Sequence, residues 1–223
     1  MSEKLWDLIY EKPRRKIKRF VKDFSYVYLP KNKINGEYFI IDNFEPSTLL
    51  NGFRVKEFNY LLNSHNDFKL LTFSLLMYNK RWKNNLKNIN WSTPVNYESY
   101  KNLKQDYSKY FNISEDKFLI IQNRKYSAKG AYIMFLYNTF LSIDFLEKNN
   151  IPFVFTLFPG GGFKLDNEFS DFMMETVFSS KMFRGCFVPQ QIIYDYIIKK
   201  GFTSEDKLFF SYGGGFFQFT KDD

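Results

Sequence analysis

A run of three glycines is the feature of this sequence best suited to chemistry. Gly160, Gly161 and Gly162 follow a strongly apolar stretch and precede Phe163. Glycines can take positive φ angles and carry no Cβ, so their backbone N–H groups can come close to an anion or a sugar. The spacing fits neither the dinucleotide-binding fingerprint nor the P-loop. The run therefore predicts either a ligand-binding turn or a tight turn with a purely structural role.

Two other turns raise the same question. The second triple glycine, Gly213 to Gly215, lies near the end of the sequence and predicts either a binding turn or a flexible exit from the preceding strand. Gly52 precedes Arg54 at a predicted strand-to-helix turn, where an arginine can face a phosphate group. An ordinary surface arginine is the alternative at this position.

The sequence offers few groups for acid–base, nucleophilic or metal chemistry. Its single histidine, His65, lies in a polar turn, where solvent exposure is expected. Asp166, Glu168 or Asp171 are nearer the first glycine run and are better candidates for a general base, although each also suits a helix cap or a surface charge. Cys186 is the only cysteine, which excludes a multi-cysteine metal site and suits buried packing. We therefore expect no metal and no cofactor.

Alternating apolar and amphipathic segments predict the elements that hold these residues. Strands are expected at 36–43, 70–77, 118–122, 151–158, 185–188 and 207–212. Helices are expected at 54–62, 131–146, 169–177 (with Ser170 as N-cap) and 192–200, with a mixture of loop and helix at 79–112. The order predicts an α/β fold: a Rossmann-like, doubly wound, mostly parallel sheet in three αβα layers, with ligands outside the carboxyl ends of its strands.

Charge and composition restrict the class of protein. Among 223 residues the formal net charge is +8, and much of the positive charge falls between Lys12 and Lys22. This basic segment suits a solvated arm, contact with anionic lipid headgroups or, with least support, nucleic acid. No nucleic-acid-binding motif supports the last option, so we expect no nucleic-acid partner. No apolar stretch reaches the roughly 18 residues of a membrane-spanning helix, and the start does not read as a signal peptide. We expect a cytoplasmic protein, and peripheral contact with the inner face of the cell membrane stays open.

The residues from about 130 to 215 carry a resemblance to a known family. They combine a strand that ends in Pro159-Gly160-Gly161-Gly162-Phe163, a helix that starts with a Ser-Asp pair, and a further strand and tyrosine-containing helix. This pattern resembles the amino-terminal domain of bacterial glycosyltransferases with the two-domain GT-B architecture, of the retaining, family 4-like kind. The sequence departs from the pattern at Phe158, where tyrosine is usual, and at Pro189.

The resemblance implies an enzyme that transfers a sugar from a nucleotide-sugar to a saccharide or lipid-linked acceptor, without a metal. It implies a basic arm at 1–34 and an acceptor-side domain at 35–223, with the donor domain absent and the isolated chain inactive. The substrate-binding candidates are Gly52, Arg54, Gly160, Gly161, Gly162, Phe163, Gly213 and Gly214. The alternative is a non-catalytic α/β module that binds anionic sugars, lipid headgroups or a partner protein. The donor, the acceptor and the stereochemical outcome stay open.

Overall fold

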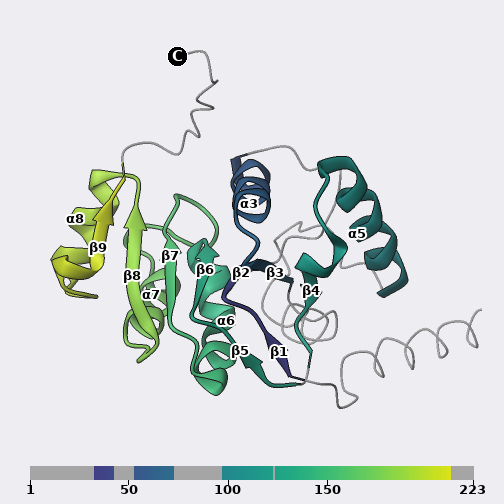
Figure 1. The fold of residues 1–223 in the computed structure, drawn as a ribbon. Coiled ribbons are helices and arrows are strands. Elements are labelled where there is room, and N and C mark those ends of the chain that lie inside the picture. Colours follow the sequence, from purple (N-terminus) through teal and green to yellow (C-terminus); the bar gives the residue numbers. More distant parts are fainter. Residues whose placement is uncertain (1–32, 43–52, 73–96, 123, 212–223) are drawn as a thin grey trace, which may run out of the picture.

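Residues 33–42, 53–72, 97–122 and 124–211 are described by the computed structural model of the chain (Figure 1). Within them, seven parallel strands form one sheet in the order β4-β3-β2-β6-β7-β8-β9. The strands are β2 (Tyr38–Asp42), β3 (Phe68–Thr72), β4 (Phe118–Ile120), β6 (Gly130–Met134), β7 (Phe153–Thr156), β8 (Phe183–Val188) and β9 (Leu208–Phe210). Two short strands, β1 (Ile34–Asn35) and β5 (Tyr126–Ser127), pair with each other. The all-parallel sheet confirms the predicted Rossmann-like, doubly wound α/β fold.

Helices cover both faces of this sheet. They are α3 (Phe53–Ser64), α5 (Tyr97–Phe111), α6 (Leu136–Asn149), α7 (Glu168–Phe178) and α8 (Gln191–Lys200). Ile40 and Ile41 are neighbours on β2 and point to opposite faces, because side chains alternate along a strand. Ile40 belongs to a cluster with Phe58 of α3 and Tyr107 of α5, whereas Ile41 belongs to a cluster with residues of α6, α7 and α8. The described residues therefore form the three predicted layers.

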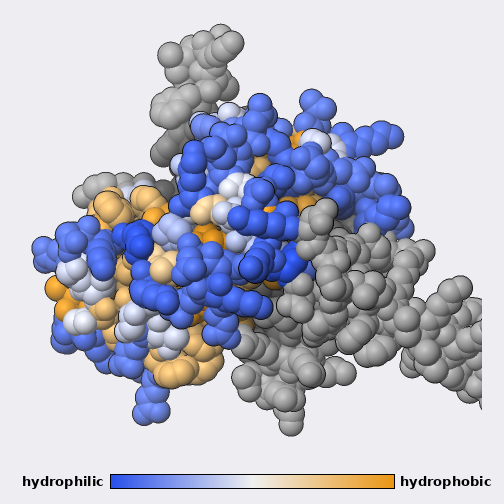
Figure 2. Space-filling view, turned by 60° about the horizontal axis from the view of Figure 1, so that its bottom comes forward, coloured by the Kyte–Doolittle hydropathy of each residue, from blue (hydrophilic) through white to orange (hydrophobic). Residues whose placement is uncertain are grey.

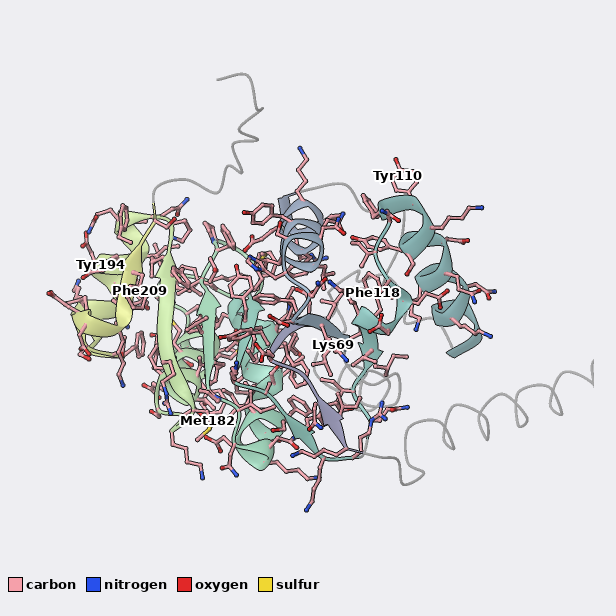
Figure 3. The ribbon with its side chains drawn as sticks, viewed as in Figure 1. Lys69, Tyr110, Phe118, Met182, Tyr194 and Phe209 are labelled. Carbon is pink, nitrogen blue, oxygen red and sulfur yellow. The ribbon has the colours of Figure 1, made fainter. Side chains whose placement is uncertain are left out.

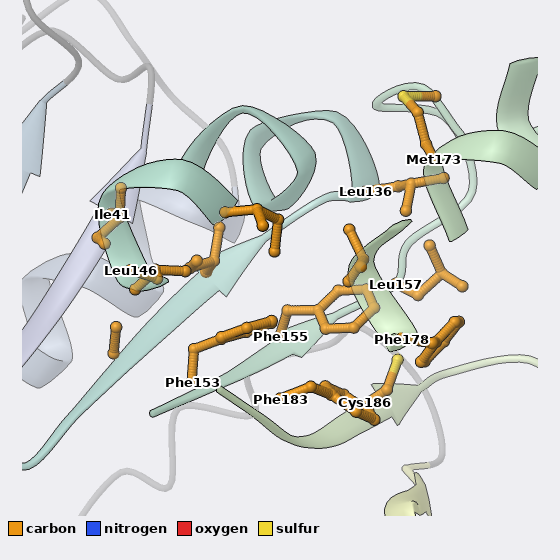
Figure 4. Close-up of a cluster of buried hydrophobic side chains, with 14 of the residues drawn as sticks. Ile41, Leu136, Leu146, Phe153, Phe155, Leu157, Met173, Phe178, Phe183 and Cys186 are labelled. Atoms are coloured by element: carbon orange, nitrogen blue, oxygen red, sulfur yellow. The ribbon is translucent and has the colours of Figure 1, made fainter. Parts of the chain in front are cut away.

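The larger core lies between the sheet and helices α6, α7 and α8 (Figure 4). Phe155 is fully buried, and its ring centroid lies 5.6 Å from that of Phe178 and 6.0 Å from that of Phe183. Cys186 is buried in the same cluster, as predicted, and burial raises the pKa of its thiol. Several of the phenylalanines in the carboxyl half of the chain thus serve as core side chains.

The two edges of the sheet differ in exposure. Phe118 on β4 is buried, whereas Phe209 on β9 is 46% exposed (Figure 3). The ring of Phe209 lies 5.5 Å from that of Phe187 and covers Gly185, where a Cβ would come within 2.5 Å of the Phe209 ring. On the face seen in Figure 2, hydrophobic residues reach the surface mainly over the left half, the side of β8, β9 and α8 in Figure 1. Phe187 and Phe209 therefore expose apolar surface at the β9 edge.

One predicted helix is wrong in its first part. The sequence predicts a helix at 131–146, but the structure has strand β6 followed by helix α6. Phe135 joins the two elements with a φ of 75°. The segment is apolar almost throughout, and periodicity alone cannot separate a short buried strand from a buried helix. The error matters because β6 is a central strand and pairs with β2.

Helix α7 begins differently from the prediction. Asn167, rather than Ser170, is its N-cap, and the Asn167 side-chain oxygen accepts a hydrogen bond from the Ser170 backbone N–H at 3.0 Å. The Ser170 hydroxyl instead accepts from the backbone N–H of Lys164 at 3.0 Å. Asp171 lies in the first turn, where the helix dipole favours a carboxylate, as predicted.

Residues 1–32 of the predicted basic arm lie outside the described residues, and Ile34 belongs to β1. Among the described residues, no helix combines the length and the apolar character needed to cross a membrane.

Replacing Phe155 with Ala is expected to destabilise the fold by about 3–5 kcal/mol, because it leaves a cavity among the core phenylalanines. Replacing Phe209 with Ala serves as the matched control and should cost much less, because that ring is half-exposed. Urea unfolding followed by circular dichroism measures both values. Equal losses for the two variants would contradict the core described above.

Candidate functional site

The sheet reverses its direction of winding between β2 and β6. From β2 the chain continues to β3 and β4 on one side, whereas β6 leads to β7, β8 and β9 on the other. Doubly wound folds bind ligands where the winding reverses, outside the carboxyl ends of the two central strands. We call the adjacent carboxyl ends of β2 and β6, at Asp42 and Met134, the switch point.

A buried carboxylate lies at the switch point. Asp42 is fully buried and accepts a hydrogen bond from the Arg54 guanidinium of α3 at 3.1 Å. Its other oxygen accepts from the Asn138 side-chain amide of α6 at 3.3 Å. Helices on opposite faces of the sheet are therefore joined to one carboxylate. Arg54 lies where the sequence predicts a ligand-facing arginine, but it is ion-paired and mostly buried rather than an ordinary surface residue.

A second polar group lies beside the first and joins α3, β6 and β7. The Tyr132 hydroxyl donates to Oε1 of Glu57 and lies 2.9 Å from the Thr156 hydroxyl. Tyrosine has only one hydroxyl proton to donate. Because the Tyr132 hydroxyl donates that proton in its hydrogen bond to Glu57, the Thr156 hydroxyl must be the donor in its hydrogen bond with Tyr132. Burial raises the pKa of Glu57, although the hydrogen bond from Tyr132 opposes the shift. Burial also raises the pKa of Tyr132, and the charge of Glu57 adds to that effect.

The first glycine run forms a tight reverse turn after β7. The backbone N–H of Phe163 donates to the Gly160 carbonyl at 2.9 Å, which closes a four-residue turn. The two central residues, Gly161 and Gly162, have φ angles of 52° and 96°, as in a type I′ turn. That turn strongly prefers Gly, Asn or Asp at its first central position and Gly at its second. Backbone geometry alone therefore explains these two glycines.

The turn also packs against the start of α6. A Cβ on Gly161 would lie 2.4 Å from the Phe135 ring, and one on Gly162 would lie 2.8 Å from the Tyr137 Cβ. The Gly161 carbonyl accepts from the Tyr137 backbone N–H at 2.9 Å, which satisfies an amide in the first turn of α6. Gly160 and Gly162 are both exposed, but Gly160 differs because nothing lies within 4 Å of where its Cβ would be.

The residues after the turn are fixed by helix α8. Phe163 is buried, and its ring meets the Tyr196 ring edge-on at 6.3 Å. The Tyr196 hydroxyl accepts from the Asp166 backbone N–H at 2.9 Å and donates to Asp171 at 2.8 Å. Lys200 also binds Asp171 at 3.0 Å, and this contact raises the pKa of Lys200. Asp171, a candidate base in the sequence, is thus part of a structural anchor.

Phe135 lies against two of the predicted site residues, Arg54 and Gly161. The Arg54 guanidinium lies over its ring at 5.9 Å, and Gly161 packs against the same side chain. The structure therefore places Arg54 and the first glycine run around one residue at the switch point. Gly52, Gly213 and Gly214 lie outside the described residues. His65 is exposed, as predicted, and lies beyond the end of α3.

Sequence reasoning missed the polar residues at the switch point. The sequence did not single out five of them as site residues: Asp42, Glu57, Tyr132, Asn138 and Thr156. Three of these, Asp42, Asn138 and Thr156, each lie in an apolar run. A buried polar group needs a hydrogen-bond partner, so a polar residue in such a run signals a network. The signal does not say which residues pair, because the partners come from elements far apart in the sequence.

Neither a metal cluster nor a relative identifies the site. Among the described residues, no group of three or more histidine, cysteine or acidic side chains could hold a metal ion. Comparison with known proteins finds no matching family model, no matching curated protein and no matching solved structure.

Adding a methyl group at Gly160 and at Gly161 should have different effects. Gly160→Ala should lower the free energy of unfolding by about 1–2 kcal/mol, because only the positive φ disfavours an alanine there. Gly161→Ala should lower the free energy of unfolding by about 1–3 kcal/mol more than Gly160→Ala does, because its new Cβ meets the Phe135 side chain. Unfolding in urea measures both. A Phe135→Gly background removes both the ring and the Cβ of residue 135, which would lie 2.4 Å and 2.5 Å from the added Cβ. There the extra loss at Gly161 should disappear, and its persistence would contradict the packing described.

Glu57→Gln should change how stability depends on pH. The pKa of Glu57 is raised in the folded state from its ordinary value of 4.5, so the folded state holds this proton more tightly than the unfolded chain. Stability of the native protein should therefore fall as pH rises from 4.5 through the raised pKa. Glutamine keeps an acceptor for the Tyr132 hydroxyl without a charge. As pH rises through this range, the variant should therefore become more stable relative to the native protein. Unfolding at a series of pH values measures the difference, and parallel curves would show that Glu57 is not perturbed.

Proposed function

We propose that the chain is the acceptor-side half of a GT-B glycosyltransferase. It would transfer a sugar from a nucleotide-sugar to a cell-surface polysaccharide or a glycolipid. The supporting observation is where the family-like motif lies. The glycine turn that carries the resemblance packs on Phe135, and Phe135 also contacts Arg54 at the switch point. The motif and the expected ligand position thus coincide.

The proposal gives each part of this edge a task. Gly160 is exposed and nothing lies within 4 Å of where its Cβ would be, so a sugar hydroxyl has room to approach its backbone. The buried Asp42 pair fixes how α3 and α6 approach the edge, so the acceptor meets a preformed surface. The donor would be held mainly by a second domain. Transfer would proceed without a metal, on the cytoplasmic side, with the membrane as one source of acceptor.

A non-catalytic binding module is the second candidate, and one observation favours it. The type I′ geometry and the contact with α6 explain Gly161 and Gly162 without any ligand. On this view the edge would bind an anionic sugar, a lipid headgroup or a partner protein without transfer. The two candidates differ in whether joining a donor domain to this chain produces turnover.

The chain alone should unfold cooperatively and transfer no sugar, because one domain can hold only one of the two reactants. Holding both reactants in place can contribute about 7–11 kcal/mol to lowering the barrier. The test is a transfer assay over a panel of nucleotide-sugars and saccharide acceptors, with and without divalent metal, for the chain alone and for a longer chain that includes a donor domain. Turnover only by the longer chain supports the proposal. Turnover that needs a metal would contradict it, and binding without turnover by both would favour the module.

A further inference from the structure

Glu57 presents a carboxylate that is held at one oxygen and open at the other. Oε1 accepts the hydrogen bond from Tyr132, whereas Oε2 has no hydrogen-bond partner in the described part of the chain and is not buried there. The side chain as a whole is half-buried. Glu57 therefore has one acceptor atom available to a ligand.

The held oxygen fixes the direction of the open one. Tyr132 belongs to the central strand β6, and Thr156 is the last residue of β7. Because the Thr156 hydroxyl donates to Tyr132 and Tyr132 donates to Glu57, the three groups form an ordered chain with one direction. Groups held by rigid strands keep their geometry better than groups on loops. The open oxygen of Glu57 is thus preoriented.

The charges around Glu57 do not neutralise it. Arg54 is three residues earlier on α3, but its guanidinium is paired with Asp42 of β2. Tyr132 faces Glu57 from β6 and is neutral, since its pKa is raised. No lysine or arginine lies within ion-pair distance of Glu57 among the described residues. A half-buried carboxylate without a cation reduces stability, and such groups are typical of functional sites.

We propose that Glu57 accepts a hydrogen bond from a hydroxyl group of the saccharide acceptor, and that Tyr132 and Thr156 position it. This inference rests on the proposed function. An anionic acceptor oxygen forms a stronger hydrogen bond with a hydroxyl than a neutral oxygen does, and saccharides offer several hydroxyls. The rival ligand for an unpaired carboxylate is a small organic cation.

The experiment measures binding of uncharged saccharides to the whole 223-residue chain. The probes are the methyl glycosides of glucose, galactose and N-acetylglucosamine, followed by ligand-observed NMR, with methylammonium as the cation probe. Glu57→Leu should weaken the best glycoside by about tenfold or more, because a charge-assisted hydrogen bond is lost. Glu57→Gln should weaken it less, because an acceptor oxygen remains. Glu175→Gln, at an exposed position on α7, is the matched control and should bind like the native chain.

The dependence on pH separates this role from a structural one. Native binding should weaken as pH falls through the raised pKa of Glu57, because protonation removes the charge that strengthens the bond. In Glu57→Gln this dependence should vanish. Tyr132→Phe should bind more weakly than the native chain, since its carboxylate is no longer held, yet should keep the dependence on pH. Thermal unfolding of each variant checks that it is folded, and if Glu57→Leu does not fold, the Gln and Phe variants carry the test.

Three results would overturn the inference, and they differ in what else they affect. If a glycoside binds the native chain and the Glu57 variants equally, Glu57 has no such role and the proposed function stands. If only methylammonium binds in a Glu57-dependent way, the group is a cation site. If no glycoside binds any variant, the proposed acceptor site and the role of Glu57 fail together.

Discussion

The buried carboxylate of Asp42 is the constraint on which the arrangement of this edge depends. A charge without solvent needs hydrogen-bond partners, and removing one partner of a buried ion pair typically destabilises a fold by about 3–5 kcal/mol. Two partners of Asp42 come from α3 and α6, which lie on opposite faces of the sheet. The two helices therefore cannot shift independently at the switch point. Phe135, Arg54 and the glycine turn keep their relative positions as a result.

The glycine turn shows how a structural and a functional role can share one motif. Gly161 and Gly162 have roles that need no ligand: they turn the chain and let it approach α6. Gly160 does not pack against α6, because the space beside it is open, and only its positive φ favours glycine there. If the turn binds a ligand, the open space beside Gly160 gives the ligand room to approach the backbone there. The other two glycines then hold that peptide in position.

The sequence was a good guide to the fold and a poor one to the site. Apolar runs and turn residues predicted six of the strands because those signals are local, whereas β6 was hidden in an apolar run that continues into α6. Arg54 does lie at the switch point, where its guanidinium pairs with Asp42 at the carboxyl end of β2. The partners of Asp42 could not be predicted, since Asn138 is 96 residues away and only the paired strands bring it close.

Stability does not account for Glu57 on α3. Val55, Phe58 and Leu62 are buried, and burial of each such side chain contributes about 1.5–3 kcal/mol, so they are sufficient to attach the helix. A net hydrogen bond contributes only about 0.5–1.5 kcal/mol, and an unpaired half-buried carboxylate offsets even that. A neutral or apolar residue at position 57 would therefore suit the fold at least as well. Glu57 stands one turn from the end of α3 that faces the switch point, so its placement is better explained by what it can bind than by what it stabilises.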